Sequence, residues 1–495
     1  MSNVNYEIRK SVTVNFVGRY SNLLIQVIVT AVLARMLNPS DFGLVAAVAV
    51  LVTFVSFISE MGLGPAVVQF QELTSAQIAG LFWFTIILGA IVATLFVGCG
   101  PLIAHFYGAP KYTRVALALG PTIALSCWVI VPLAILRRTQ RFRAIVSIEV
   151  ISAIVSGIVA ILAAFHQAGV FSLIIKSTVF SILMFISCAV RSKFNPFIRP
   201  SFSGMLHVYS YSGYQFLFNL VNYFTRNLDK ILIGRMMGAA TLGIYDMSYR
   251  LMLMPIYNLT HVIGPALQPA YAAQQQDMAT IFVSYQKVIR LLVIVGGFVG
   301  VVSFFCSRDI IYLFYGDKWS AAVDIFAILS LSICVQIVLS SSGAIFQSIG
   351  RTDLLSLSGT LSALTSIPAI VAGAWTGNLK LLSWFLVISF LANAATTFFI
   401  LARFGFKRTV YELFRPSIGC IAGISTLLAV SAAFKMTHTF GETSSLLLTA
   451  GKVLVIVALY WLLARLTGDL DFLRKAVAPK LKNRGQPKVG FISRL

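Results

Sequence analysis

Charged residues are scarce in this sequence, and acidic residues are the scarcest. Only 11% of the 495 residues are charged, and 16 of them are Asp or Glu, whereas an average soluble chain has about 25% charged residues. A further 58% of the residues are hydrophobic, which is more apolar surface than a soluble fold of this length can bury. This composition excludes a soluble enzyme and any large catalytic domain outside a membrane.

The sequence also lacks the motifs of common catalytic and metal sites. Its six cysteines show no C-x-x-C spacing and no paired histidines, so neither a disulfide scaffold nor a zinc site is expected. It contains no Walker A motif, no Gly-x-Ser-x-Gly and no His-Glu-x-x-His, which excludes the corresponding ATPases and hydrolases. We therefore predict that the protein is not an enzyme, has no cofactor and binds no metal.

Long apolar runs are abundant, and they define the fold class. A helix needs about 20 apolar residues to cross a bilayer, and runs of that size repeat along the whole chain. We predict an all-α, polytopic membrane protein with about fourteen spans, at 13–35, 43–66, 78–104, 113–136, 145–165, 168–190, 210–236, 241–271, 287–306, 321–347, 354–375, 381–403, 416–434 and 444–464.

The net charge of +22 would suggest a nucleic-acid partner in a soluble chain. In a membrane protein, Lys and Arg instead collect in cytoplasmic loops beside anionic lipid, and we predict no nucleic-acid partner. Alternate connections hold 24 basic residues on one side and six on the other. Both termini are therefore expected in the cytoplasm, which requires an even number of spans.

The second half of the chain repeats the first. At an offset of 200 residues, ARM at 34–36 meets GRM at 234–236, Gly43 meets Gly243, and GPA at 64–66 meets GPA at 264–266. After some drift, FYG at 106–108 matches 314–316, and RT at 138–139 matches 351–352. Because spans 1 and 7 cross in the same direction, the repeat is parallel.

This repeat predicts two six-helix lobes related by a pseudo-twofold axis, followed by two extra helices. The expected parts are an N-lobe at 1–205, a C-lobe at 206–403, spans 13 and 14 at 404–466, and a basic cytoplasmic tail at 467–495. Within the tail, residues 469–481 suit an amphipathic helix lying against anionic lipid, although a disordered tail explains the composition equally well.

Polar residues form matched stripes on the first helix of each lobe. Their spacing of three and four residues places each set on one helix face, and each span 1 residue lies 200 positions before a span 7 residue. The stripe in span 1 is Asn15, Arg19, Asn22, Gln26 and Thr30, and the stripe in span 7 is Gln215, Asn219, Asn222, Arg226, Asp229 and Lys230. Such faces must turn to protein or water.

The stripes predict a cationic cavity between the lobes. Arg19, Arg226 and Lys230 outnumber Asp229, and Asp246 lies four residues before Arg250, a spacing that favours an internal ion pair. Arginine and lysine in a cleft of low dielectric constant attract phosphate or carboxylate. The candidate substrate-binding residues are Arg226, Lys230, Arg250, Arg19, Asn22, Asn219, Asn222 and Gln26; Asp229 and Asp246 are candidates for ion coupling. Alternatively, the stripes only join helices, at about 1 kcal/mol per contact.

Four segments of the sequence resemble a known family. LARMLNPSDFGLVA, EMGLGPAVVQ, RNLDKILIGRMMGAATLGIYDMSYRL and FYGDKW are similar to the Wzx-like polysaccharide repeat-unit flippases, of the colanic-acid and succinoglycan exporter type. These belong to the multidrug/oligosaccharidyl-lipid/polysaccharide (MOP) exporter superfamily, which also contains the MATE drug exporters. The resemblance covers spans 1 to 12 and implies a MATE-like fold.

The resemblance also implies a function. Such proteins move an undecaprenyl-pyrophosphate-linked oligosaccharide to the outer leaflet of the inner membrane by alternating access, for exopolysaccharide, capsule or O-antigen synthesis. An H⁺ or Na⁺ gradient is expected to drive the cycle, with a polysaccharide polymerase and co-polymerase as further partners. Two alternatives stay open: a MATE-type exporter of organic cations, which needs an acidic cavity, and a non-transporting scaffold of a polysaccharide synthase.

Overall fold

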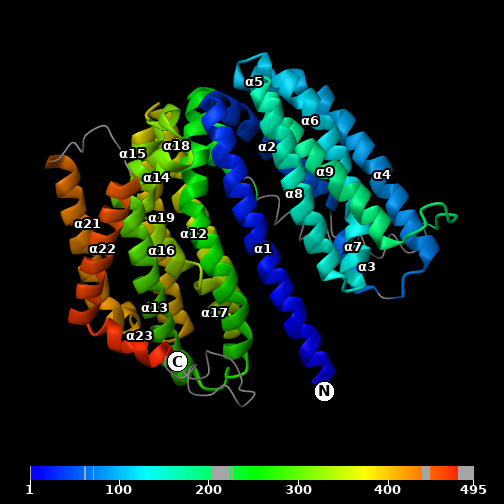
Figure 1. The fold of residues 1–495 in the computed structure, drawn as a ribbon. Coiled ribbons are helices and arrows are strands. Elements are labelled where there is room, and N and C mark those ends of the chain that lie inside the picture. The colour runs from blue at the N-terminus through cyan, green and yellow to red at the C-terminus, as the bar shows by residue number, and fades with distance from the viewer. Residues whose placement is uncertain are drawn as a thin grey trace. The chain divides into compact units, whose positions relative to one another are not determined.

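The computed structural model describes residues 2–60, 63–70, 72–201, 223, 227–437 and 446–477. All regular secondary structure in these ranges is helical. The chain divides into two compact units, Met1–Gly243 (unit 1) and Ile244–Leu495 (unit 2), and each is described by itself (Figure 1). The boundary between the units lies inside one helix, whereas the sequence repeat places the lobe boundary at 205–206; the four predicted lobe and tail limits stay predictions.

Unit 1 begins with a long helix and continues through pairs of helices that follow each other closely. Its elements are α1 (Ser2–Met36), α2 (Pro39–Glu60), α3 (Leu63–Gln69), α4 (Ser75–Gly98), α5 (Gly100–Tyr107), α6 (Lys111–Trp128), α7 (Ile130–Arg138), α8 (Phe142–Phe165), α9 (Val170–Ser192) and the start of α12 (Gly238–Ala272).

Unit 2 contains the remainder of α12 and the helices that follow it. These are α13 (Met278–Phe305), α14 (Ser307–Phe314), η1 (Asp317–Trp319), α15 (Ala322–Ser330), α16 (Ile333–Leu339), α17 (Ser342–Ser348), α18 (Thr352–Trp375), α19 (Leu379–Ile400), η2 (Leu401–Gly405), α20 (Val410–Phe414), η3 (Arg415–Ser417), α21 (Ile418–Thr437), α22 (Leu446–Leu466) and α23 (Asp469–Val477).

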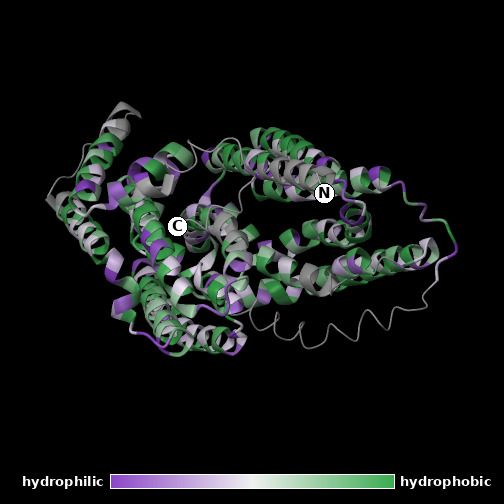
Figure 2. Ribbon diagram, turned by 90° about the horizontal axis from the view of Figure 1, so that it is seen from below, coloured by the Kyte–Doolittle hydropathy of each residue, from purple (hydrophilic) through white to green (hydrophobic). Residues whose placement is uncertain are grey.

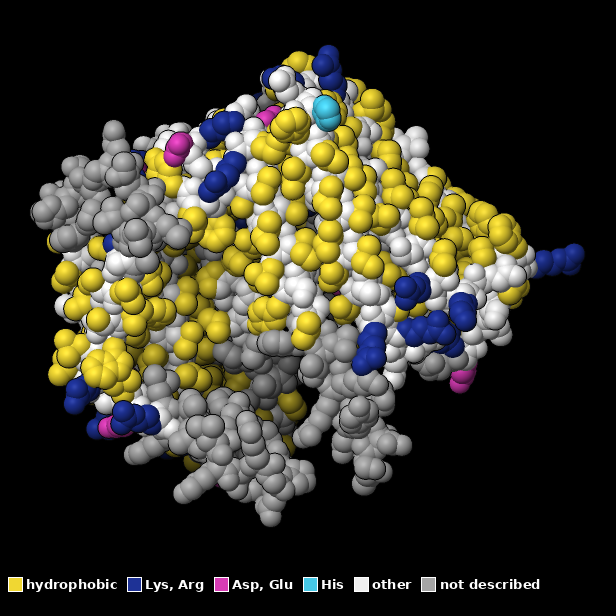
Figure 3. All heavy atoms as spheres, in the orientation of Figure 1, with side chains coloured by type: hydrophobic (Ala, Val, Ile, Leu, Met, Phe, Trp, Pro, Cys, Tyr) yellow, Lys and Arg dark blue, Asp and Glu magenta, His cyan; other side chains and the backbone are white. Residues whose placement is uncertain are grey.

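Apolar side chains cover the outer faces of these helices. Nine helices of the described ranges are long and apolar enough to cross a bilayer, and a tenth is counted if the bent pair Ala322–Ser330 and Ile333–Ser348 forms one span. Hydrophobic residues dominate the helices in Figure 2 and the visible face in Figure 3. A helix satisfies its own backbone hydrogen bonds, so this surface can face lipid. The protein is a multi-pass membrane protein, and the count of fourteen spans stays a prediction.

Small residues allow close packing in unit 1. A Cβ atom added to Gly18 of α1 would lie 2.1 Å from Cγ1 of Val146 in α8, and one on Gly157 of α8 would lie 2.5 Å from Cγ2 of Val29. Between these two contacts α1 runs along α8 for about three turns. Glycine at such positions lets transmembrane helices approach each other closely, and here it fixes which face of α1 is buried.

The start of α12 packs against the start of α2 within unit 1. A Cβ atom on Gly43 would lie 1.6 Å from the carbonyl oxygen of Ala239, and one on Gly243 would lie 1.9 Å from that of Pro39. The two backbones therefore touch at the glycines that the sequence repeat had aligned. Close to this crossing in sequence, Ile233 and Leu242 are buried, so residues of the second repeat contribute to the core of unit 1. At the surface, Arg235 lies over the ring of Phe106 at 5.7 Å.

In unit 2, α13 lies at the centre and packs against α15, α16 and α21, while α18 packs along α19 (Figure 1). Hydroxyl groups join the latter pair, with Ser358 Oγ 2.8 Å from Thr397 Oγ1 and Ser366 Oγ 2.9 Å from Ser389 Oγ. Such bonds satisfy polar groups that would otherwise face hydrocarbon.

Residues with positive φ occur at equivalent places in the two repeats, just before α8 and α18. Gln140 and Gly350 both have positive φ, and the residues that follow them, Arg141 and Arg351, are the N-cap residues of α8 and α18. The sequence alignment of 138–139 with 351–352 is therefore wrong by three residues. Arg141, and not Arg138, is the structural equivalent of Arg351, because the turn before α8 is longer than a matching of Arg-Thr pairs assumes.

Candidate substrate-binding surface

The polar stripe of α1 forms a separate face of that helix. Arg19 and Gln26 are exposed and Asn22 is half-buried, and Gln26 Nε2 donates to Asn22 Oδ1 at 3.4 Å. About a sixth of a turn away lies the face that packs on α8 through Gly18 and Val29. On the opposite side of α1 the exposed residues are apolar: Val17, Leu24 and Ile28.

This three-sided division explains the composition of α1. Its apolar side suits lipid, and its glycine side is covered by α8. Arg19 makes no ion pair with any residue that the structure describes. Its guanidinium, which holds five donors, is therefore available to an anion.

Only the last part of the span 7 stripe lies in the described ranges. Asp229 is buried and its Oδ1 accepts the backbone N–H of Lys230 at 2.8 Å, while the Lys230 side chain is half-buried. Arg226, Asn219 and Asn222 lie outside the described residues. Their assignment to the cavity stays a prediction.

Tyr223, which is not among the predicted site residues, attaches this part of span 7 to α2. Its hydroxyl donates to the carbonyl of Val50 in α2, and its ring stacks on Phe54 with centroids 6.0 Å apart. Asn227 Nδ2 then donates to the Tyr223 carbonyl at 2.9 Å. In the sequence, the position of this tyrosine beside the polar stripe of span 7 was the feature that could have indicated the contact with α2.

The predicted pair on α12 is present. Arg250 Nε donates to Asp246 Oδ2 at 2.7 Å, with the carboxylate 2% exposed and the Arg250 side chain 55% exposed. The buried carboxylate of Asp246 therefore orients the exposed guanidinium of Arg250. Only Nε of Arg250 is used in this pair, which leaves the two Nη groups to bind an anion with two parallel hydrogen bonds.

Aromatic residues surround this pair in unit 2. Tyr315, of the second FYG motif, is buried, and its hydroxyl donates to the Met247 carbonyl at 3.4 Å. Tyr245 and Tyr249 stack with centroids 5.4 Å apart. At the equivalent positions of the first repeat, Asp246 and Arg250 are replaced by Ala46 and Val50, so the charged pair is a feature of the second half alone.

Two further ion pairs of unit 2 were missed because their partners are distant in sequence. Lys452 Nζ of α22 lies 2.9 Å from Asp309 Oδ2 of α14, and Arg290 Nε of α13 lies 2.6 Å from Asp469 Oδ1 of α23. A lone lysine within an apolar run was the available signal, because such a cation needs a partner. Both pairs fasten C-terminal helices to the second repeat.

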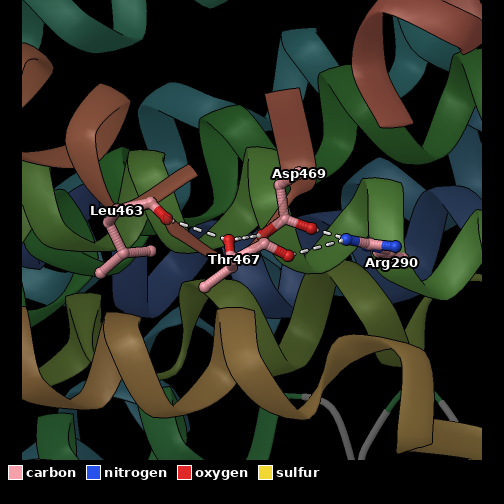
Figure 4. Close-up of polar contacts among 4 residues, drawn as sticks. All are labelled: Arg290, Leu463, Thr467 and Asp469. Carbon is pink, nitrogen blue, oxygen red and sulfur yellow. Dashed lines mark hydrogen bonds and ion pairs between the residues drawn. The ribbon is translucent and has the colours of Figure 1, made fainter. Parts of the chain in front are cut away.

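Figure 4 shows how α23 is attached. Besides the ion pair with Asp469, Arg290 Nη2 donates to the Thr467 carbonyl at 3.3 Å, and Thr467 Oγ1 donates to Asp469 Oδ2 and to the Leu463 carbonyl. Arg290 also lies over the Phe472 ring at 4.9 Å. The helix predicted to begin at Asp469 is thus present as far as Val477, and residues 478–495 lie outside the described ranges.

Together, the helices define a polytopic membrane protein with the architecture of the MOP exporters. The computed model matches a structure of the lipid II flippase MurJ in an inward closed conformation with a TM-score of 0.70, over 93% of this chain and 99% of the other, at 12% identity. A MATE family multidrug transporter of the MOP superfamily, in an inward-facing conformation, gives 0.58 over 83% and 96%, also at 12% identity. The predicted MATE-like fold is confirmed.

The chain belongs to the family of polysaccharide biosynthesis proteins, whose model matches residues 32–324. It is similar to the teichuronic acid biosynthesis protein TuaB of Bacillus subtilis, with 25% identity over 75% of this chain and 77% of the relative. It is also similar to the succinoglycan biosynthesis transport protein ExoT of Rhizobium meliloti, with 22% identity over 72% and 73%. The resemblance seen in the sequence is confirmed.

Proposed function

We propose that this protein is a flippase for a lipid-linked oligosaccharide, and that its substrate is an undecaprenyl-pyrophosphate-linked repeat unit of an exopolysaccharide, capsule or O-antigen. The substrate moves from the cytoplasmic to the periplasmic leaflet of a bacterial inner membrane. Family membership, the similarity to the succinoglycan transport protein ExoT and the fold shared with a lipid II flippase support this proposal.

The exposed Arg250, held by the buried Asp246, is the observation that carries it. Arg250 lies about 18 Å from the start of α12, a helix of 35 residues, and within the apolar run 241–271 that the sequence predicts to be a span. A cation at that depth is costly unless water or an anion meets it. A diphosphate group is an anion that the free Nη groups can bind with two hydrogen bonds.

In the proposed cycle, the cationic residues of both repeats bind the diphosphate in a central cavity. Arg250 and Arg19 are exposed and suited to this role, and the predicted Arg226 and Lys230 add to the positive field, with Asn22, Asn219, Asn222 and Gln26 as uncharged donors. The polyprenyl tail stays in lipid while the lobes alternate. Asp229 and Asp246 are the candidate groups for coupling to H⁺ or Na⁺, and a polymerase with its co-polymerase would consume the product.

The test is a flipping assay in proteoliposomes with a fluorescently labelled undecaprenyl-pyrophosphate-linked oligosaccharide. Dithionite destroys label in the outer leaflet only, so an active flippase exposes the whole pool. Arg250→Gln is expected to slow flipping about tenfold or more, because hydrogen bonds to charged groups contribute about 2 kcal/mol each. Asp246→Asn should have a smaller effect, since it removes the orienting partner but keeps the cation.

Arg351→Gln is the matched control, because Arg351 is also paired with a nearby aspartate, Asp353 two residues away, but lies at the start of α18. It should flip at the wild-type rate. A wild-type rate for Arg250→Gln at normal protein abundance would contradict the cationic site. A MATE-type exporter would instead move organic cations and ignore the labelled lipid, and a scaffold would flip nothing while still supporting polymer synthesis after neutralisation of the stripe.

A further inference from the structure

The two repeats share a local structure in which an N-cap arginine contacts the end of the following helix. Arg141, the N-cap residue of α8, donates through Nη1 to the Arg191 carbonyl at the end of α9, at 3.1 Å. Arg351, the N-cap residue of α18, donates through Nη1 to the Phe404 carbonyl after α19, at 3.3 Å. One arginine thus joins two consecutive helices in each repeat.

The charges around these two arginines differ. In unit 2, Asp353 neutralises Arg351 with contacts of 2.8 Å and 2.9 Å, and Glu412 lies 3.7 Å from Arg408. In unit 1, the residue two positions after Arg141, which corresponds to Asp353, is Arg143. The capping arginine is therefore neutralised by a neighbouring carboxylate in unit 2, whereas in unit 1 the equivalent position carries a second cation.

This basic end of unit 1 gathers exposed cationic side chains on the α7–α8 turn and on the segment after α9. None of them makes an ion pair with a residue of the described ranges: Arg137, Arg141, Arg143, Arg191, Lys193 and Arg199. The acids on neighbouring elements are Glu149 of α8, which acts electrostatically on Arg137, and the exposed Glu72 before α4. Figure 3 shows Lys and Arg side chains gathered at this end of the unit.

The segment after α9 is held across α4 and presents an aromatic ring outward. Trp83 Nε1 donates to the Pro196 carbonyl at 2.9 Å, the Ser201 N–H donates to the Ala76 carbonyl at 2.9 Å, and the Phe194 ring packs edge-on against Phe82 at 5.6 Å. Between these fixed points the Phe197 side chain is 85% exposed. A tethered backbone therefore displays a large apolar side chain beside the cations.

We propose that this end of unit 1, residues 137–143 with 191–199, is a binding surface for anionic phospholipid headgroups. The guanidinium groups bind headgroup phosphates, and the Phe197 ring enters the interfacial region of the leaflet beside them. Clusters of Lys and Arg next to a membrane span attract anionic lipid at about 1 kcal/mol per charge, and aromatic rings favour the same depth. The proposal does not depend on the transported substrate.

Bulk phospholipid suits this surface better than a single lipid-linked diphosphate. The cations are exposed and spread over two connections, and the ring points outward with them. A site selective for one ligand would instead be concave and would bury its polar groups. Several headgroups can bind the surface at once, and its occupancy should depend on lipid charge rather than on headgroup identity.

The test measures binding of phosphatidylglycerol and of phosphatidylcholine to the purified full-length protein in detergent by native mass spectrometry. Arg143→Asp places a carboxylate where unit 2 carries Asp353, and it changes the charge by two units. It should weaken phosphatidylglycerol binding about tenfold or more and leave phosphatidylcholine binding unchanged. The matched control is Arg351→Gln, which should change phosphatidylglycerol binding less than twofold because Asp353 already neutralises that arginine.

Phe197→Ala tests the aromatic part of the surface. It should weaken binding of both phospholipids several-fold, whereas Phe165→Ala, at the other end of α8 with a side chain 76% exposed, should leave the binding of both phospholipids unchanged. The thermal midpoint of each variant reports whether it is folded. Unchanged phosphatidylglycerol binding by a folded Arg143→Asp protein would overturn the proposal.

A competition experiment distinguishes phospholipid headgroups from the diphosphate of a lipid-linked substrate as the ligand of this surface. Undecaprenyl pyrophosphate, added at a few per cent of the phosphatidylglycerol, should not displace it from this surface. Displacement at that ratio, lost in Arg143→Asp, would show that the surface belongs to the substrate and would overturn the proposal.

Discussion

Gly43 and Gly243 touch each other at the crossing of α2 and α12, although 200 residues separate them. A Cβ atom on Gly43 would lie 2.9 Å from the Gly243 nitrogen, and one on Gly243 would lie 3.0 Å from the Gly43 nitrogen. The near equality of the two distances shows that these equivalent residues of the sequence repeat meet in a symmetric way at the crossing.

Alanine at either glycine is expected to prevent this crossing. The added Cβ would overlap a backbone carbonyl at 1.6 Å or 1.9 Å, and backbone atoms cannot move aside as a flexible side chain can. We predict that Gly43→Ala and Gly243→Ala each lower the thermal midpoint sharply and reduce the amount of folded protein in the membrane, measured by fluorescence-detected size-exclusion chromatography.

Gly359→Ala is the matched control, because Gly359 also lies inside a helix but has open space around its Cβ position. This change should leave the midpoint unchanged or raise it, since alanine favours a helix over glycine by about 0.5–1 kcal/mol. Equal behaviour of the three variants would contradict the close backbone contact.

The Asp309–Lys452 pair should show strongly non-additive energetics. Both oxygens of the buried Asp309 accept from Lys452 Nζ, at 2.9 Å and 3.1 Å. Lys452→Met leaves an uncompensated buried carboxylate, and removing one member of a buried pair costs about 3 kcal/mol or more. The free energy of unfolding in a mild detergent is the quantity to measure.

The double change Asp309→Leu with Lys452→Met removes both charges and should restore most of that stability. A double variant as unstable as the sum of the two single variants would show that the residues do not act as a pair.

Two truncated chains test whether the anchored part of the tail, residues 469–477, contributes to stability. A chain ending after Val477 keeps Asp469, the partner of Arg290, and should retain normal stability and export. A chain ending after Gly468 loses that partner, leaves Arg290 with a side chain only 20% exposed, and should be clearly less stable. Identical midpoints for the two truncations would mean that the Arg290–Asp469 contact contributes little.

The sequence stripe on span 7 leads to a further expectation. Arg226→Ala and Lys230→Ala should each reduce polymer export severely while the protein still inserts, and Asp229→Asn should be milder because it removes no cation. Arg226→Lys should recover part of the activity, since an ammonium group lacks the two-pronged geometry of a guanidinium. Complementation of a flippase-deficient strain, with protein levels checked by blotting, measures this, and full export by the double alanine variant would contradict it.

The predicted topology can be tested independently of transport. Reporter fusions or cysteine labelling at Lys111, Lys318 and Lys380 should report the periplasm, and sites within 137–143 should report the cytoplasm. A cytoplasmic signal at two of the three lysine sites would reverse the orientation.

Local features of this protein could be predicted from the sequence, because they depend on short spacings. The apolar runs form helices because a chain in lipid must satisfy its backbone hydrogen bonds internally. Asp246 pairs with Arg250 because residues four positions apart lie on the same face of a helix. The repeat of Gly43 in Gly243 was also visible, although nothing in the sequence showed that the two glycines touch.

Long-range contacts could not be predicted in this way. Asp309 and Lys452 are 143 positions apart, and no periodicity links them. The sequence aligned Arg138 with Arg351, because both are followed by threonine. The equivalence of Arg141 with Arg351 becomes visible only in the structure, where the residue before each arginine has a positive φ. Contacts that depend on how helices are arranged need the structure.

The crossing at Gly43 and Gly243 has a consequence for biosynthesis. The packing of unit 1 includes Tyr223, the buried Ile233 and Gly243, so the first six spans cannot complete their packing when the ribosome reaches residue 205. The membrane insertion machinery must deliver span 7 and the first turn of α12 before that core closes, and a gene fragment expressed as 1–205 would lack those contacts while one expressed as 1–243 would contain them.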